Sequence, residues 1–102
     1  FTLSVAGLVA GGPADLSLSG AGAGANCIMA YSLAGGGPTS TAVGDVDLSQ
    51  PINRLPSLTA DGNGDAGLTV NVPSGAAGVS VWIQAVDMSS ATLSNSLAEV
   101  VG

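Results

Sequence analysis

The chain has 102 residues, and only eight are charged: seven acids and one arginine, Arg54, with no lysine and no histidine, for a net charge of −6. This size fits one domain, and the missing imidazole and amine groups remove the usual partners that activate nucleophiles or hold zinc, so we expect residues 1–102 to form a single non-enzymatic domain. One arginine cannot neutralise several phosphates, and no apolar run reaches membrane-spanning length, so we expect neither nucleic acid as a partner nor membrane insertion.

Apolar and polar residues alternate along much of the chain, as Leu68, Val70 and Val72 do with Thr69 and Asn71. Alternation with period two is typical of strands that cover a core with one face, and Gly- and Pro-rich turns separate the runs at short intervals. The sequence therefore predicts an all-β chain: an immunoglobulin-like or fibronectin-III-like sandwich of seven to eight antiparallel strands. We expect strands near residues 2–9, 14–19, 26–33, 42–48, 54–60, 66–72, 79–87 and 92–101.

The chain has one cysteine, Cys27, so the predicted sandwich has no internal disulfide. It lies in an apolar run that ends at Tyr31, which favours a small buried side chain in a strand, while pairing between chains or a reactive thiol remains the alternative. Pro51 precedes the predicted strand at 54–60 and Pro56 lies within it, so we interpret this segment, which contains Leu55 and Leu58, as an edge strand because proline cannot donate to a ladder.

Six runs in this order carry a resemblance to a known group of domains: Ser19-Gly20, Tyr31–Leu33, Leu58–Gly64, Leu68–Pro73, Val81–Asp87 and Thr92–Asn95. Together they resemble small β-sandwich modules of secreted and surface-exposed proteins of environmental bacteria. The resemblance implies a sandwich fold, and it implies no catalytic residues because members of that group have none to carry over.

One loop has the residue types of a calcium site: Asp61, Asn63 and Asp65 place oxygen side chains at alternate positions. A complete calcium loop would end in an acid seven residues beyond Asp65, where this chain has Val72. We therefore favour a Gly/Asn/Asp hairpin turn. We expect no cofactor, and calcium is possible only if Asp45 or Asp47 also approaches the loop.

The remaining polar candidates have plain structural interpretations. Asp45 and Asp47 share a face if their segment is extended; paired carboxylates could do acid/base chemistry, but a solvated strand face is the favoured interpretation. Asp87 is expected to cap the turn that follows it. Trp82 is out of phase with its neighbours Val81 and Ile83, so it either packs in the core or serves as an exposed binding platform.

The sparse charge bears most directly on function. Natural sheets protect their edges with lysine, other charges, proline or bulges, and this chain has little charge to place there. We expect a structural subunit of an extracellular filament, sheath or surface layer, a homopolymer joined through β-edges or terminal strands. The expected assembly residues are Phe1, Leu3, Val5, Leu93, Leu97 and Val101.

The alternative function is a cell-surface adhesion module that recognises glycan or protein through loops at one end of the sandwich. Its binding residues would be Trp82, Tyr31 and the loop at 61–65. The numbering begins at Phe1 rather than methionine, which fits removal of a leader or excision from a longer chain. We expect an extracellular or cell-surface location after signal-peptide removal.

Overall fold

The computed structural model describes residues 1–42 and 44–102, which form short β-strands and one turn of 3-10 helix, η1 (Ser74–Ala76). Within these residues no helix is long and apolar enough to cross a membrane. The strands in chain order are β1 (Thr2–Ala6), β2 (Pro13–Ser19), β3 (Asn26–Ser32), β4 (Thr39–Thr41), β5 (Gly44–Val46), β6 (Asn53–Arg54), β7 (Leu58–Thr59), β8 (Ala66–Asn71), β9 (Ser80–Asp87), β10 (Thr92–Leu93) and β11 (Leu97–Val100).

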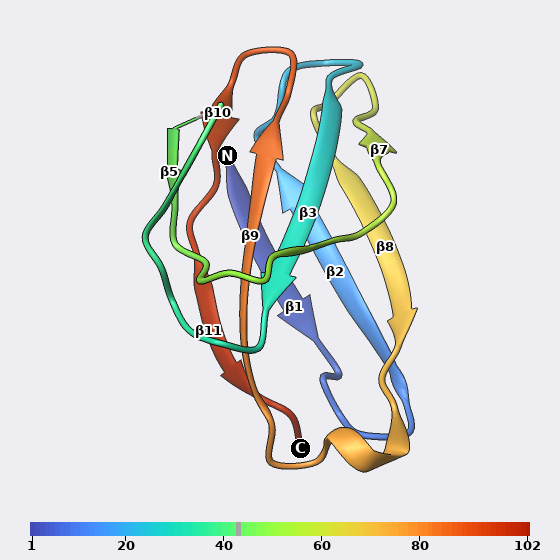
Figure 1. The fold of residues 1–102 in the computed structure, drawn as a ribbon. Coiled ribbons are helices and arrows are strands. Elements are labelled where there is room, and N and C mark those ends of the chain that lie inside the picture. Colours follow the sequence, from blue (N-terminus) through green and yellow to red (C-terminus); the bar gives the residue numbers. More distant parts are fainter. Residues whose placement is uncertain (43) are drawn as a thin grey trace.

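The strands form two main antiparallel sheets (Figure 1). Sheet A has the order β1–β2–β8. Sheet B is built on β9 and β3; β10 and β11 pair with β9, while β6 and β7 pair with β3. The prediction of an all-β chain with antiparallel sheets and no disulfide is confirmed. The N-terminus lies near one end of the structure and the C-terminus at the other.

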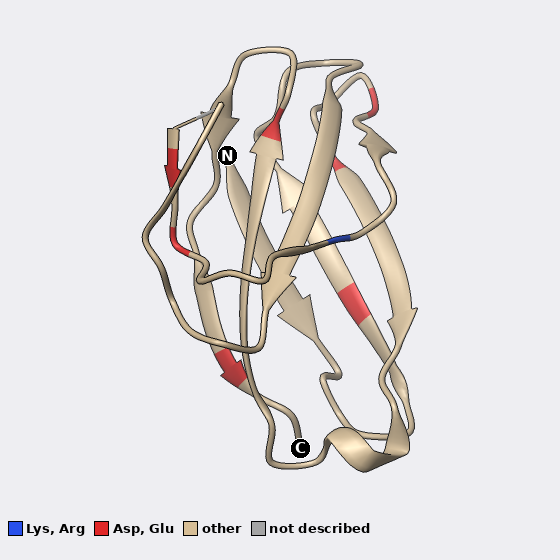
Figure 2. Cartoon of the chain, viewed as in Figure 1, with Lys and Arg blue, Asp and Glu red and all other residues tan. Residues whose placement is uncertain are grey.

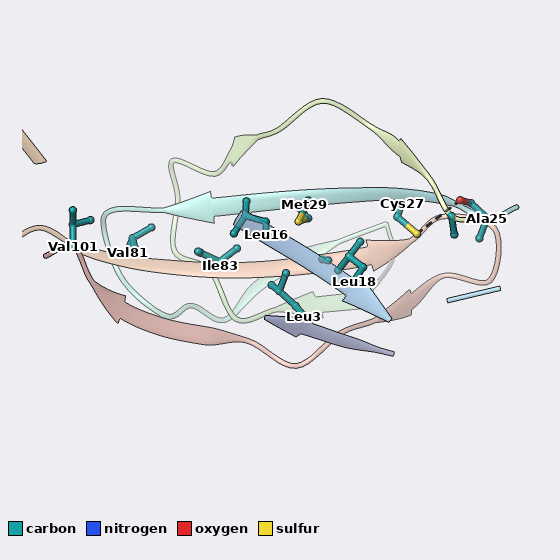
Figure 3. Close-up of a cluster of buried hydrophobic side chains, with 11 residues drawn as sticks. Leu3, Leu16, Leu18, Ala25, Cys27, Met29, Val81, Ile83 and Val101 are labelled. Carbon is teal, nitrogen blue, oxygen red and sulfur yellow. Dashed lines mark hydrogen bonds between the residues drawn. The ribbon is translucent and has the colours of Figure 1, made fainter. Parts of the chain in front are cut away.

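The main core lies between the two sheets (Figure 3). Leu3, Leu16 and Leu18 enter it from sheet A, and Met29 and Ile83 enter it from sheet B. Burying a side chain of this size contributes roughly 1.5–3 kcal/mol, so the period-two alternation that places these residues inside also holds the sheets together.

Cys27 is fully buried in this core, as the favoured interpretation predicted. Burial, and secondarily the charge of Asp87 opposite it, raises the pKa of the Cys27 thiol. The reactive form of cysteine is the thiolate, so a raised pKa in an apolar site indicates a packing role.

The predicted strand at 92–101 is interrupted by an extra residue. Leu93 lies opposite Val86 and Leu97 opposite Ile83, so three residues of one segment face two of β9. Such a bulge bends a strand and re-aims its side chains. Here it divides the segment into β10 and β11 and turns Asn95 toward sheet A, where it contacts Leu3.

The predicted strand at 54–60 is interrupted in the same way. Arg54 lies opposite Ala30 and Leu58 opposite Cys27, with Pro56 in the longer side of the interruption. The expected hairpin across residues 61–65 is also wrong: β7 pairs with β3 in sheet B, while β8 belongs to sheet A. The turn at 61–65 therefore carries the chain from one sheet to the other.

The predicted strand at 42–48 is not part of either main sheet. Instead β4 and β5 form a separate two-stranded ribbon, and Val43 lies outside the described residues. The ribbon belongs to residues 33–52, which we call the flap. Val46 and Leu48 of the flap are buried against the outer face of sheet B, away from the main core. An alternating run can be buried on either side of a sheet, so the sequence could not distinguish the two.

Candidate functional site

The two outer strands of sheet A, β1 and β8, differ in how their free edges are covered. At β1, the backbone N–H of Leu3 donates to Asn95 Oδ1 at 2.7 Å, and Asn95 Nδ2 donates to the Leu3 carbonyl at 3.1 Å. The side-chain amide thus occupies the place that the backbone of another strand would take. This contact joins residues 92 positions apart and caps the edge of β1 at Leu3, while the outward backbone groups of Val5 have no hydrogen-bond partner among the described residues.

The direction of every other backbone group in sheet A follows from this contact. Residues of antiparallel strands alternate between pairs that exchange hydrogen bonds and pairs that do not. Because Leu3 bonds outward, its partner Leu18 must bond toward β8, to Ala66. Leu68 and Val70 likewise bond to β2. The backbone groups that point away from the sheet are therefore those of Gly67, Thr69 and Asn71.

Within residues 1–42 and 44–102, no group caps this outer edge of β8. The outward N–H and C=O groups of Gly67, Thr69 and Asn71 have no hydrogen-bond partner among the described residues. All three residues are exposed, and the strand contains no charge and no proline. The Thr69 hydroxyl donates to Asp15 Oδ1 at 2.7 Å, which holds its side chain over β2 and away from the edge. β7 lies beside the start of β8 (Figure 1) but pairs with β3.

A second edge with outward-facing backbone groups lies on β11 in sheet B. Further along, this edge is joined to the segment after β1, because the Gly102 N–H donates to the Leu8 carbonyl at 3.0 Å and the Gly102 carbonyl accepts the Ala10 N–H at 2.9 Å. The Val101 N–H donates to Val79 and the Val101 carbonyl accepts from Gly78, so Val101 bonds toward β9. By alternation Glu99 also bonds toward β9, while Ala98 and Val100 present their N–H and C=O groups outward. Val100 is 63% exposed. In Figure 1, β8 and β11 lie on opposite sides of the structure.

The six residues predicted to make assembly contacts all point into the fold. Leu3 and Val101 are buried in the core. Phe1, Val5 and Leu97 are partly buried and pack against it, while Leu93 lies beneath the flap. These side chains would meet another copy only after β1 or the C-terminal strand had left its own sheet.

The loop at 61–65 uses its first acid internally. Asp61 Oδ1 accepts the backbone N–H groups of Asn63 at 2.8 Å and Asp65 at 3.0 Å, and the same contacts lower the pKa of Asp61. Gly64 has φ +78°, and a side chain there would collide with the backbone of Ala21. The carboxylate and the glycine therefore both serve a tight turn.

The structure does not bring the other acids to this loop (Figure 2). Asp45 accepts the Ser40 hydroxyl at 2.9 Å and Asp47 accepts the Ser96 hydroxyl at 3.0 Å, both at the flap. Among residues 1–42 and 44–102, no three acidic or cysteine side chains gather closely enough to share a metal ion. Calcium binding by Asp61, Asn63 and Asp65 stays a hypothesis, and it would need further oxygen ligands that are not acidic side chains of the described residues.

Asp87 caps the turn after β9, as predicted. Its Oδ1 accepts the N–H groups of Ser89 at 2.9 Å and Ser90 at 3.3 Å, while Oδ2 accepts the N–H of Gly22 at 3.1 Å. The bond from Gly22 is the leading cause of a lowered Asp87 pKa. The carboxylate thereby ties the loop before β3 to the turn that follows β9.

Trp82 and Tyr31 lie on opposite faces of sheet B. Tyr31 is paired with the core residue Ile83 and packs against the core, whereas Trp82 is paired with Ser32 on the outer face. The Trp82 ring lies within 3.3 Å of the place where a side chain on Gly36 would begin, so it is half-buried against the flap. The two rings and the loop at 61–65 therefore form no common platform.

Two important side chains were missed by the sequence analysis. Asn95 caps β1, and Gln84 is buried on the outer face of sheet B, where it accepts the Asp47 N–H and donates to the Ser94 carbonyl. A lone Asn in a Ser-rich segment carries no signal of a partner 92 residues away. The position of Gln84 in the alternating pattern places it on the outer face of its strand, but a single glutamine there only weakly indicates that another segment covers that face.

Comparison with known proteins gives no match: no family model fits the sequence, and no curated protein or solved structure is significantly similar to it.

Proposed function

We propose that this protein is a structural subunit of an extracellular filament, sheath or surface layer, and that copies join through the free edge of β8. We also propose that its sheets are a variant of the immunoglobulin-like or fibronectin-III-like sandwich. The strand orders β1–β2–β8 and β10–β9–β3 support this, since they match the A–B–E and G–F–C arrangements of such folds.

The observation that carries the assembly proposal is the contrast between the two edges of sheet A. The β1 edge is capped at Leu3 by the Asn95 amide, and the segment after it is bonded to Gly102 through Leu8 and Ala10. Among the described residues, the β8 edge presents three outward residues without charge, proline or cap. Unprotected edges of this kind pair with strands of other chains, and natural monomers usually block them.

A filament built from one repeated contact requires two different surfaces that recognise each other, because a single surface that pairs only with itself closes into a dimer. In this proposal the outward backbone groups of Ala98 and Val100 on β11, which precede the bonds of Gly102 to Leu8 and Ala10, supply the other surface. We infer that Gly67, Thr69 and Asn71 of one copy pair with Ala98 and Val100 of the next. The two edges lie on opposite sides of the structure, so this contact repeats without closing.

Thr69→Pro tests the contact directly. The Thr69 N–H is not used within sheet A, so proline leaves the ladder to β2 intact and removes only an outward donor, as tolerated on edge strands. We expect Thr69→Pro to abolish ordered polymers in sedimentation and electron microscopy. Thr69→Val, which keeps the N–H but loses the bond to Asp15, is the matched control and should assemble like the wild type.

Val100→Pro removes the corresponding donor from β11 and should also block assembly. Asn71→Pro serves as a second β8 variant if Thr69→Pro fails to fold by circular dichroism. Polymers that persist in folded Thr69→Pro, or a wild-type protein that stays monomeric at high concentration, would refute the proposal. If Val100→Pro assembles while Thr69→Pro does not, the contact is a β8–β8 dimer and the filament model is wrong.

A further inference from the structure

The outer face of sheet B carries an apolar pocket beneath the flap. Its volume is about 250 Å³. Ile28, Ala30 and Val86 of sheet B line one side, and Val46 and Leu48 of the flap line the other. An antiparallel sheet commonly leaves one face to solvent, so a second apolar layer on this face calls for an explanation.

The register of sheet B explains how the space arises. Two rows of residues cross the outer face: Leu93, Val86 and Ile28 form one row, and Gln84, Ala30 and Arg54 form the next. The first row is filled by branched side chains. In the second row the middle residue has only a methyl group, which leaves a hollow between Gln84 and Arg54.

The flap is fixed around this hollow by polar contacts at its base. Ser32 Oγ donates to the Ser49 carbonyl at 2.6 Å, and Gln84 Oε1 accepts the Asp47 N–H at 2.8 Å. Both polar atoms of the Gln84 side chain are satisfied, because Nε2 donates to the Ser94 carbonyl at 2.9 Å. These hydrogen bonds hold the flap in place as one wall of the pocket.

The only basic side chain of the sequence lies at this pocket. Arg54 lines it, is exposed, and has no hydrogen bond or ion pair with any described residue, although the chain carries seven acids. Figure 2 shows Arg54 on the segment that crosses β3; the acidic positions lie at the flap, at the upper end of the structure, on β11, and on β2 in the other sheet. A guanidinium with free donors beside an apolar cavity is complementary to a carboxylate attached to an apolar tail.

We propose that this pocket binds a small amphipathic monocarboxylate, with its tail between sheet B and the flap and its carboxylate on Arg54. A cavity of about 150 Å³ accepts benzene, so by the same ratio a space of this size holds roughly ten non-hydrogen atoms. Medium-chain carboxylates such as octanoate have that size. This inference does not depend on assembly through β8.

The test is titration of the wild-type protein with octanoate, followed by ligand-observed NMR, which works for monomers and polymers alike. Octan-1-ol has the same tail without the charge, and acetate has the charge without the tail. We expect octanoate to bind about tenfold more tightly than octan-1-ol, and acetate not to bind, because a charge-assisted bond to Arg54 adds to the burial of the tail.

Two variants separate the tail from the charge. Arg54→Gln should weaken octanoate binding about tenfold and leave octan-1-ol binding unchanged. Ala30→Leu fills the hollow and should abolish binding of both, whereas Ala6→Leu, at an exposed alanine of β1 outside the pocket, should bind like the wild type. Thermal unfolding shows whether each variant is folded. If Ala30→Leu does not fold, Arg54→Gln alone still tests the proposal.

Absence of octanoate binding at millimolar concentration would overturn the proposal. So would octanoate binding that survives unchanged in folded Ala30→Leu. Equal affinity for octanoate and octan-1-ol, or no effect of Arg54→Gln, would overturn the assignment of the carboxylate to Arg54.

Discussion

Replacing Asn95 by alanine should both destabilise the fold and open the edge of β1. The substitution removes two hydrogen bonds to Leu3, of 2.7 and 3.1 Å, and exposes one backbone donor and one acceptor on that edge. A hydrogen bond contributes about 1 kcal/mol net, and water can reach this part-buried site, so we expect a loss of about 1–2 kcal/mol. For a domain of this size that lowers the melting temperature by about 5–10 °C.

Urea unfolding followed by the fluorescence of Trp82, the only tryptophan, measures this change. Asn63→Ala is the matched control, because Asn63 is exposed and its side chain has no hydrogen bond to a described residue. Asn95→Asp should lose at least as much stability as Asn95→Ala at neutral pH, since a carboxylate can accept the Leu3 N–H but repels the Leu3 carbonyl. Asn95→Ala with the stability of Asn63→Ala would refute the capping role.

Three further predictions address other parts of the fold. Hydrogen bonds lower the pKa of Asp87 in the folded state below the unfolded value of about 3.9, so the unfolded state binds more protons in acid, and the free energy of unfolding should be constant above about pH 5 and fall below it. Asp87→Asn should reduce this fall when unfolding is measured at pH 7 and pH 3. An unchanged fall in the variant would contradict this cause. Leu48→Ala should cost about 2–4 kcal/mol in urea unfolding because Leu48 is only 1% exposed, and a cost near zero would show that the flap is detached. A chelator should leave the melting temperature unchanged, whereas a drop of about ten degrees that Asp61→Ala removes would show that the loop at 61–65 binds calcium.

The long alternating strands were predictable because their pattern is local. The expected segments 14–19, 26–33, 66–72 and 79–87 correspond closely to β2, β3, β8 and β9. In 14–19, 66–72 and 79–87, apolar residues recur at every second position, so the inner and outer faces follow from the sequence itself. The segment 26–33 is a short apolar run, which predicts a buried strand but not which of its faces is the inner one.

The interruptions and the edge chemistry were not predictable from the sequence. Each bulge arises because one segment has one residue more than the part of the strand it pairs with. This difference can be counted only when the register of the two strands is known. The closure of β1 depends on an amide 92 residues away, and the free edge of β8 follows from that contact through the alternation of the ladder. The pocket likewise depends on Ala30 lying between Gln84 and Arg54, which are distant in the chain.

Amide hydrogen exchange at β8 tests the central claim most directly. In dilute solution the outward N–H groups of Gly67, Thr69 and Asn71 face solvent and should exchange rapidly, while those of Leu68 and Val70, bonded to β2, should be protected. In concentrated, assembled protein the three outward amides should become protected together with those of Ala98 and Val100. Assembled protein in which Gly67, Thr69 and Asn71 still exchange as fast as in dilute solution would contradict the account.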